Sequence, residues 1–224
     1  MNRHARNVIL SALAAAALAP ATVTTAQEAD EALTPRAKYC TAEPVALDTL
    51  LALRAAGAAT PAAGEAGAEA EAGPLAGVEE IALTEIPAGE AADEATAQAI
   101  ADLELIYASC YNEGAFLQAA ALLSERGQRA LAELATDPAV AARFATPAPF
   151  RRDQRIPGIA VDTVQVFPDG TAGAIVTWAP GDPRQEVNLH LYVKGDDGLW
   201  YLDREIAVAA EDGDTSAAAA TPEA

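Results

Sequence analysis

The chain has 224 residues and a formal net charge of −19, with 33 acidic side chains against 14 basic ones. This charge argues against binding to nucleic acid or to an anionic lipid surface, because basic patches supply the affinity in both cases. Hydrophobic residues make up 51% of the chain, but aromatic residues only 5%. Much of the remainder is alanine, which buries little area, so we expect one modest core.

The first residues have the pattern of an export signal. A basic start is followed by an apolar run over 8–19 and then by small residues, with cleavage expected after Ala21 or Ala26. The run is too short to span a membrane. We predict a Sec-type signal peptide over 1–26 and a secreted, periplasmic or cell-envelope location, with an uncleaved N-terminal anchor as the alternative. Cleavage removes two arginines and no acid, and so changes the net charge from −19 to −21.

The chain contains two cysteines, Cys40 and Cys110. Two cysteines in an exported chain predict one disulfide, because the exported environment is oxidising. Its loop is long, and the loop-entropy model assigns it about 3–5 kcal/mol of stabilisation. The alternative is a pair of buried free thiols.

Residues 27–92 are predicted to lie outside the main domain. In the arm over 27–54, a Thr41-Ala-Glu-Pro44 start precedes leucines at helical spacing, so we predict a short helix. The stretch over 55–92 begins as a linker of Ala, Gly, Glu and Pro, which bury too little area to order it. It ends in a weak apolar segment over 78–86 whose pattern defines no particular structure.

The main domain is predicted over 93–209 and begins with helices. Asp93 is suited to cap a helix that ends at the Asn112-Glu-Gly114 turn. Its apolar face consists of residues at helical spacing: Ile100, Leu103, Tyr107, Cys110 and Tyr111. We expect a second helix from Ala115 that continues toward Leu134, and then a short helix after 136–138.

Four strands follow the helices. They are expected over 159–167, 172–178, 187–194 and 199–208, separated by turns rich in Pro, Gly and Asp. The tail over 210–224 is acidic and alanine-rich, so we expect it to be disordered. Helices followed by an antiparallel meander predict an α+β fold, with the N-terminal helices packed on one face of a curved antiparallel sheet.

Three short motifs in this order resemble the NTF2-like superfamily, including its SnoaL-like members, which share a cystatin-like α+β cone. They are Cys110-Tyr-Asn-Glu-Gly-Ala-Phe116, Leu122-Leu-Ser124 and Asp197-Gly-Leu-Trp-Tyr-Leu-Asp203. The resemblance covers about residues 93–209. It implies a cone-shaped fold whose sheet wraps around a pocket. The superfamily hosts isomerases, dehydratases, cyclases and binding domains, so the fold does not define the function.

The chain departs from the family pattern at two places. Ala115 stands where the family often has an aspartate after the turn glycine, so the second helix lacks a capping carboxylate. The strand usual after that helix is also missing from the pattern, because 125–134 has helical periodicity. These departures indicate a reduced cone.

His190 and Asp203 are the catalytic candidates. If Lys194 pairs with Leu199 across the last turn, His190 lies opposite Asp203, near enough for the carboxylate to orient the imidazole. Such a pair resembles the His/Asp pairs of some family enzymes. A bulged turn would instead place Arg204 opposite His190. Alternatively, His190 and Asp203 have no catalytic role and form an ion pair on a polar sheet face exposed to solvent.

Five aromatic residues are expected to line the pocket: Tyr107, Tyr111, Trp178, Tyr192 and Tyr201. For Tyr107 and Tyr111, a place in the core is the commoner alternative, and Trp178 is core or pocket wall. A basic cluster is formed by four arginines: Arg143, Arg151, Arg152 and Arg155. Its alternatives are an anion-binding site, contact with the acidic tail, or a solvated edge. No metal-binding or cofactor-binding motif is present, so we expect neither a metal nor a cofactor.

The first functional hypothesis is therefore an exported, non-catalytic NTF2-like domain that binds a small apolar ligand or a protein partner. The second is a cofactor-independent isomerase or lyase, with His190 as base and Asp203 orienting it. The third is an interaction module of the cell envelope. A homodimer is compatible with each of them.

Overall fold

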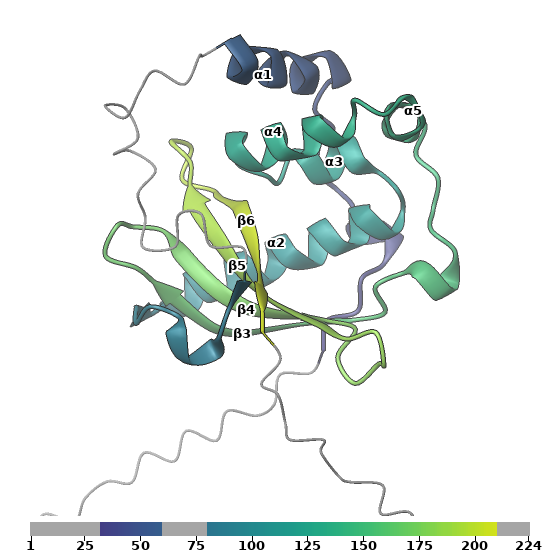
Figure 1. The fold of residues 1–224 in the computed structure, drawn as a ribbon. Coiled ribbons are helices and arrows are strands. Elements are labelled where there is room, and N and C mark those ends of the chain that lie inside the picture. The colour runs from purple at the N-terminus through teal and green to yellow at the C-terminus, as the bar shows by residue number, and fades with distance from the viewer. Residues whose placement is uncertain (1–31, 60–79, 210–224) are drawn as a thin grey trace, which may run out of the picture.

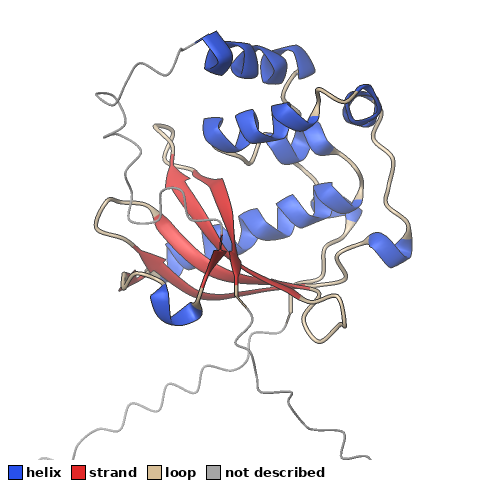
Figure 2. Ribbon diagram, viewed as in Figure 1, coloured by secondary structure: helices blue, strands red, loops and turns tan. Residues whose placement is uncertain are grey.

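The computed structural model describes residues 32–59 and 80–209, and it has an α+β fold (Figure 1). Figure 2 shows helices stacked over one face of a curved sheet, as the sequence predicts. The predicted signal peptide, most of the linker and the acidic tail lie outside the described residues. Within the described part, no helix is long and apolar enough to cross a membrane.

The sheet has the strand order β1-β6-β5-β4-β3-β2. Its centre is an antiparallel meander of the four predicted strands: β3 (Ile159–Val166), β4 (Ala172–Trp178), β5 (Glu186–Lys194) and β6 (Trp200–Val208). Two short strands extend the edges: β1 (Glu80–Ile81) runs parallel to β6, and β2 (Glu90–Ala91) runs antiparallel to β3. The segment over 80–92, whose sequence pattern defines no structure, therefore belongs to the sheet.

Helix α2 (Glu94–Asn112) packs across the sheet. It begins where the Asp93 carboxylate accepts a hydrogen bond from the Thr96 N–H, 2.7 Å long. It ends at Gly114, whose φ of 64° lies in the left-handed region. A Cβ at this position would collide with the carbonyl oxygen of Ala148, so the turn requires glycine for both reasons.

The predicted long second helix is wrong, because the chain forms two helices there: α3 (Phe116–Ala120) and α4 (Glu125–Leu134). Between them the backbone bonds to the sheet. The Leu202 N–H donates to the Leu122 carbonyl over 3.0 Å, and the Leu202 carbonyl accepts from the Ser124 N–H over 2.9 Å. Ser124 then caps α4 by accepting from the Gly127 N–H.

The N-terminal arm packs on the outer side of these helices. Within it, α1 (Leu47–Ala59) packs on α4 through the fully buried Leu50, and Arg54 pairs with Glu133 at 3.2 Å. The predicted Cys40–Cys110 disulfide is confirmed, and it joins the arm to α2. Beside α3 and α4 lies the short helix α5 (Pro138–Ala145), and η1 (Ala37–Tyr39), η3 (Leu83–Glu85) and η4 (Arg152–Gln154) are single turns of 3-10 helix.

An apolar cluster lies on each face of the sheet. On the helix side, Tyr192 and Leu202 pack against Ile100 and Leu103 of α2. On the far side, the segment that carries β1 and η3 covers the sheet, and its Ile81 packs with four residues: Phe167, Leu189, Leu191 and Ile206. Two polar residues of β5, His190 and Tyr192, therefore face α2 and are buried, whereas Glu186 and Lys194 at the ends of the strand are exposed.

Candidate functional site

A carboxylate and an imidazole are buried together between α2 and β5. His190 Nδ1 lies 2.9 Å from Glu104 Oε1, and the Tyr192 hydroxyl donates to the same oxygen over 2.8 Å. All three residues have an exposed fraction of 0%. Because a carboxylate only accepts hydrogen bonds, Nδ1–H of His190 is the donor. We refer to Glu104 and His190 as the Glu104–His190 pair.

The periodicities of α2 and β5 explain this meeting. Glu104 lies four residues after Ile100, on the stripe of α2 that faces the sheet. Side chains alternate along β5, so His190 and Tyr192 both face α2, and the alternating Leu189 and Leu191 face away. Sequence reasoning missed Glu104. The available signal was a carboxylate at an apolar position of an amphipathic helix.

The predicted register between β5 and β6 is wrong, and so is the predicted placement of His190 opposite Asp203. The strands pair Lys194 with Trp200, and a bulge at Asp203 then places Glu205 opposite His190. The turn shifts the pairing by one residue, because Lys194 pairs with Trp200 and not with Leu199. The bulge shifts it by one residue more. The alternative that places Arg204 opposite His190 is wrong for the same reason.

Hydrogen bonds at the turn and at the bulge stabilise this register. At the turn, Asp197 accepts hydrogen bonds from the Leu199 N–H over 3.0 Å and from the Tyr201 hydroxyl over 2.6 Å. At the bulge, the Asp203 carboxylate accepts from the Ser124 hydroxyl over 2.5 Å. Asp203 is thus bound to the start of α4, and Tyr201 to the turn. Neither side chain joins the Glu104–His190 pair.

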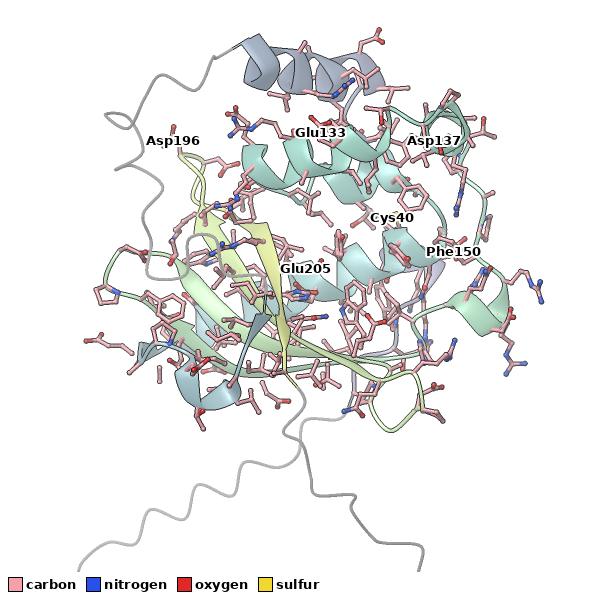
Figure 3. The ribbon with its side chains drawn as sticks, in the orientation of Figure 1. Cys40, Glu133, Asp137, Phe150, Asp196 and Glu205 are labelled. Carbon is pink, nitrogen blue, oxygen red and sulfur yellow. A yellow bond between two sulfur atoms is a disulfide. The ribbon has the colours of Figure 1, made fainter. Side chains whose placement is uncertain are left out.

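Glu205 is the second carboxylate near the imidazole. Figure 3 labels it beside β6, in the region between this strand and α2. Its side chain reaches solvent, yet protein atoms surround it on most sides. This burial raises the pKa of the Glu205 carboxyl, the positive charge of His190 opposes the increase, and the charge of Glu104 adds to it.

The protonation of the buried pair is set by opposing effects. Burial lowers the pKa of His190, but the charge and hydrogen bond of Glu104, with a smaller contribution from Glu205, raise it to a net value above the ordinary 6.5. Burial and the Glu104 charge raise the pKa of Tyr192 well above 10.0. The Tyr192 phenol therefore stays protonated at neutral pH and continues to donate to Glu104.

Three polar atoms at this place are buried and have no hydrogen-bond partner among the described residues: Glu104 Oε2, His190 Nε2 and Trp178 Nε1. The Trp178 ring meets the His190 ring edge to face, with centroids 5.9 Å apart. Native proteins rarely leave buried polar atoms unpaired. These atoms offer an acceptor, a titratable nitrogen and a donor to a small polar group.

A cavity of about 370 Å³ lies among α2, α3, α4 and α5, and we call it the helical cavity. Its lining is mostly aromatic and aliphatic, and Arg143 is its only charged residue. The main lining residues are Tyr107, Tyr111, Phe116, Leu134, Val140 and Phe150. Leu134 is 60% exposed and marks where the cavity reaches solvent. Figure 3 labels Phe150 between the helices and the loop that carries η4.

Aromatic rings connect the helical cavity to the Glu104–His190 pair. Tyr107 and Tyr111 line the cavity, and their rings lie 6.4 Å and 6.1 Å from the ring of Trp178. Trp178 in turn contacts His190. Of the five residues expected at a pocket, Tyr107 and Tyr111 thus lie on the cavity, Trp178 and Tyr192 lie behind it, and Tyr201 lies elsewhere.

The predicted basic cluster is divided in the structure. Arg152 and Arg155 line a second pocket of about 610 Å³ together with Arg184, which the sequence did not group with them. Arg155 pairs with Glu113 at 3.5 Å, and Arg184 with Asp182 at 2.9 Å. Arg151 pairs with Asp153 instead, at 3.3 Å. Arg143 alone of the four lies on the helical cavity.

No group of His, Cys, Asp and Glu side chains that could hold a metal ion occurs within residues 32–59 and 80–209. No protein-family model, curated protein or solved structure matches the chain. Its function must therefore be inferred from its own geometry. That geometry is an aromatic cavity open to solvent, with a buried acid–base pair behind its wall.

Proposed function

We propose that this domain binds a small, predominantly apolar molecule in the helical cavity and does not catalyse a reaction. The aromatic lining of the cavity is the observation that carries the proposal. Its volume of about 370 Å³ lies within the range of small-molecule sites, which are mostly apolar and carry a few polar groups.

The rings of the cavity wall support each other. Tyr111 stacks on Phe150 with centroids 5.0 Å apart, and Phe116 packs on Phe144 at 5.3 Å. Contacts of this kind hold the rings in place before a ligand arrives, so binding loses little side-chain entropy. An apolar ligand then gains about 25 cal/mol for each Å² of apolar surface removed from water.

We further propose that the domain is a reduced NTF2-like cone and that the mature protein works outside the cytoplasm. The helices packed on a curved antiparallel sheet support the first statement. The Cys40–Cys110 disulfide supports the second, because structural disulfides persist in oxidising compartments. Intact-mass analysis of the secreted protein tests the export: loss of about the first 26 residues supports it, and a full-length chain that stays in the cell contradicts it.

The binding proposal is tested by titration with phenylnaphthylamine, an uncharged aromatic dye. The wild-type protein should bind it, and Val140→Trp should bind it at least about tenfold more weakly, because the indole fills the cavity. Leu199→Trp is the control, since it adds the same ring at an exposed turn outside the cavity. Equal binding by the wild type and Val140→Trp, with both folded, would refute the proposal.

A second candidate function is proton transfer, and the unpaired Nε2 of the buried His190 favours it. Nε2 would remove a proton from a carbon next to a carbonyl and return it to another carbon, which is an isomerisation. Glu104 would hold Nδ1–H and stabilise the imidazolium that forms. Tyr107 or Trp178 would have to move to admit the substrate, because the imidazole is fully buried.

This second candidate is tested by incubating the protein in D₂O with each of a panel of small ketones and using NMR to measure the exchange of their carbon-bound protons. Exchange should depend on the protein and be lost in both His190→Gln and Glu104→Gln. Asp203→Asn is the control, because Asp203 contacts Ser124 and not the imidazole. Exchange that persists in His190→Gln would remove the enzyme hypothesis and leave the binding proposal intact.

A further inference from the structure

We infer that the helical cavity takes molecules whose apolar body ends in one anionic group, and that Arg143 selects that group. The inference rests on the proposed function and specifies its ligand class. The ligand would place its apolar part among the rings and its anionic end at the exposed edge of α5.

Arg143 is the only charged residue that lines the cavity. The chain has far more acidic than basic side chains, yet Arg143 makes no ion pair or hydrogen bond with another described residue. Other arginines are paired with carboxylates: Arg54, Arg126, Arg129, Arg151, Arg155 and Arg184. The positive charge at the cavity is therefore available to a ligand.

Two aromatic rings of the cavity hold this guanidinium. Arg143 Cζ lies 5.5 Å from the centroid of Phe116 and 5.0 Å from that of Phe150. Cation–π contacts of this kind position the guanidinium. Its N–H donors remain free to form two parallel hydrogen bonds with a carboxylate or a sulfonate. Because Arg143 is exposed, an anion bound there keeps part of its hydration, so little desolvation opposes binding.

The second pocket is a weaker candidate for an anion, although it contains more arginines. Its Arg155 and Arg184 already face the carboxylates of Glu113 and Asp182. An anion there would have to displace these partners. Its lining also offers less apolar surface for the body of a ligand than the aromatic cavity does.

The experiment compares two dyes that share one aromatic body. Anilinonaphthalene sulfonate carries an anionic group, and phenylnaphthylamine lacks it. Both are titrated into the wild type, Arg143→Met and Arg143→Lys. Arg143→Met keeps an unbranched side chain over the rings and removes the charge. Arg151→Met is the control, because Arg151 is a nearby exposed arginine that lines neither pocket.

Arg143→Met should weaken binding of the sulfonate about tenfold more than binding of phenylnaphthylamine, and Arg143→Lys should restore part of this difference. Arg151→Met should change neither. An equal change in affinity for the two dyes in Arg143→Met, or no change for either, would overturn the inference while the binding proposal survives. Failure of the wild type to bind phenylnaphthylamine would overturn the proposed function itself.

Discussion

Glu104 and His190 lie 86 positions apart in the chain, yet their side chains meet over 2.9 Å with no exposure to solvent. One comes from the first long helix of the domain and the other from the third strand of the meander. This contact joins the two layers of the fold. Oε1 of the buried Glu104 accepts hydrogen bonds from both an imidazole and a phenol. The negative charge of this carboxylate stabilises the protonated form of the imidazole.

The stability of the domain should fall as pH rises from about 6.5 through the pKa of the folded His190. Burial is the largest single effect and lowers this pKa, but the charge and the hydrogen bond of Glu104, together with the charge of Glu205, raise it above 6.5 in the folded state. The folded protein therefore holds the proton more tightly than the unfolded chain, and this contribution is complete only below the unfolded pKa. Urea unfolding across this pH range measures the effect.

His190→Gln is the control for this dependence, and it should show a flatter profile over the same pH range. Outside the first 26 residues, His190 is the only histidine in the chain, so no other imidazole can replace its contribution. A wild-type profile that rises with pH, or an equal slope in His190→Gln, would show that the pair does not hold a proton in this way.

Tyr192→Phe should lower the free energy of unfolding by about 2 kcal/mol, because it removes a buried donor from a charged acceptor. Urea unfolding at neutral pH gives the value. Tyr201→Phe is the matched control: its hydroxyl also donates to a carboxylate, but at the turn near solvent, so its loss should have a much smaller effect. Equal effects of the two changes would argue against a buried network.

Reduction of the Cys40–Cys110 disulfide should lower the free energy of unfolding by about 4 kcal/mol, because it closes a loop with a sequence separation of 70 residues. Unfolding with and without a reductant measures the difference. A Cys40→Ala/Cys110→Ala variant should match the reduced protein and should no longer respond to the reductant. A reductant effect that persists in this variant would mean that the loss has another cause.

The elements with strong local patterns were predictable. Asp93 and Gly114 mark the two ends of α2, and the alternation of β5 with its flanking turns defines that strand. Both depend on contacts close in the sequence, where capping and periodicity act directly. For the same reason the fold class follows from the order of the elements.

The site itself was only half predictable. His190 was named from the sequence, but its pairing with Asp203 was wrong, because the register of β6 depends on a bulge where Asp203 bonds to Ser124, far away in the chain. Glu104 was missed for a related reason. Glu104 can be recognised as the partner of His190 only when α2 is known to pack on the side of β5 that carries His190. No pattern within either segment predicts that packing.

The central claim is that a small apolar molecule binds in the helical cavity, and methyl NMR during a phenylnaphthylamine titration tests it most directly. We expect shifts at the cavity methyl groups of Leu131, Leu134 and Val140. Leu189 and Ile206, on the far face of the sheet, should not shift. Shifts confined to the far face, or no saturable shifts at the three cavity residues, would contradict the account.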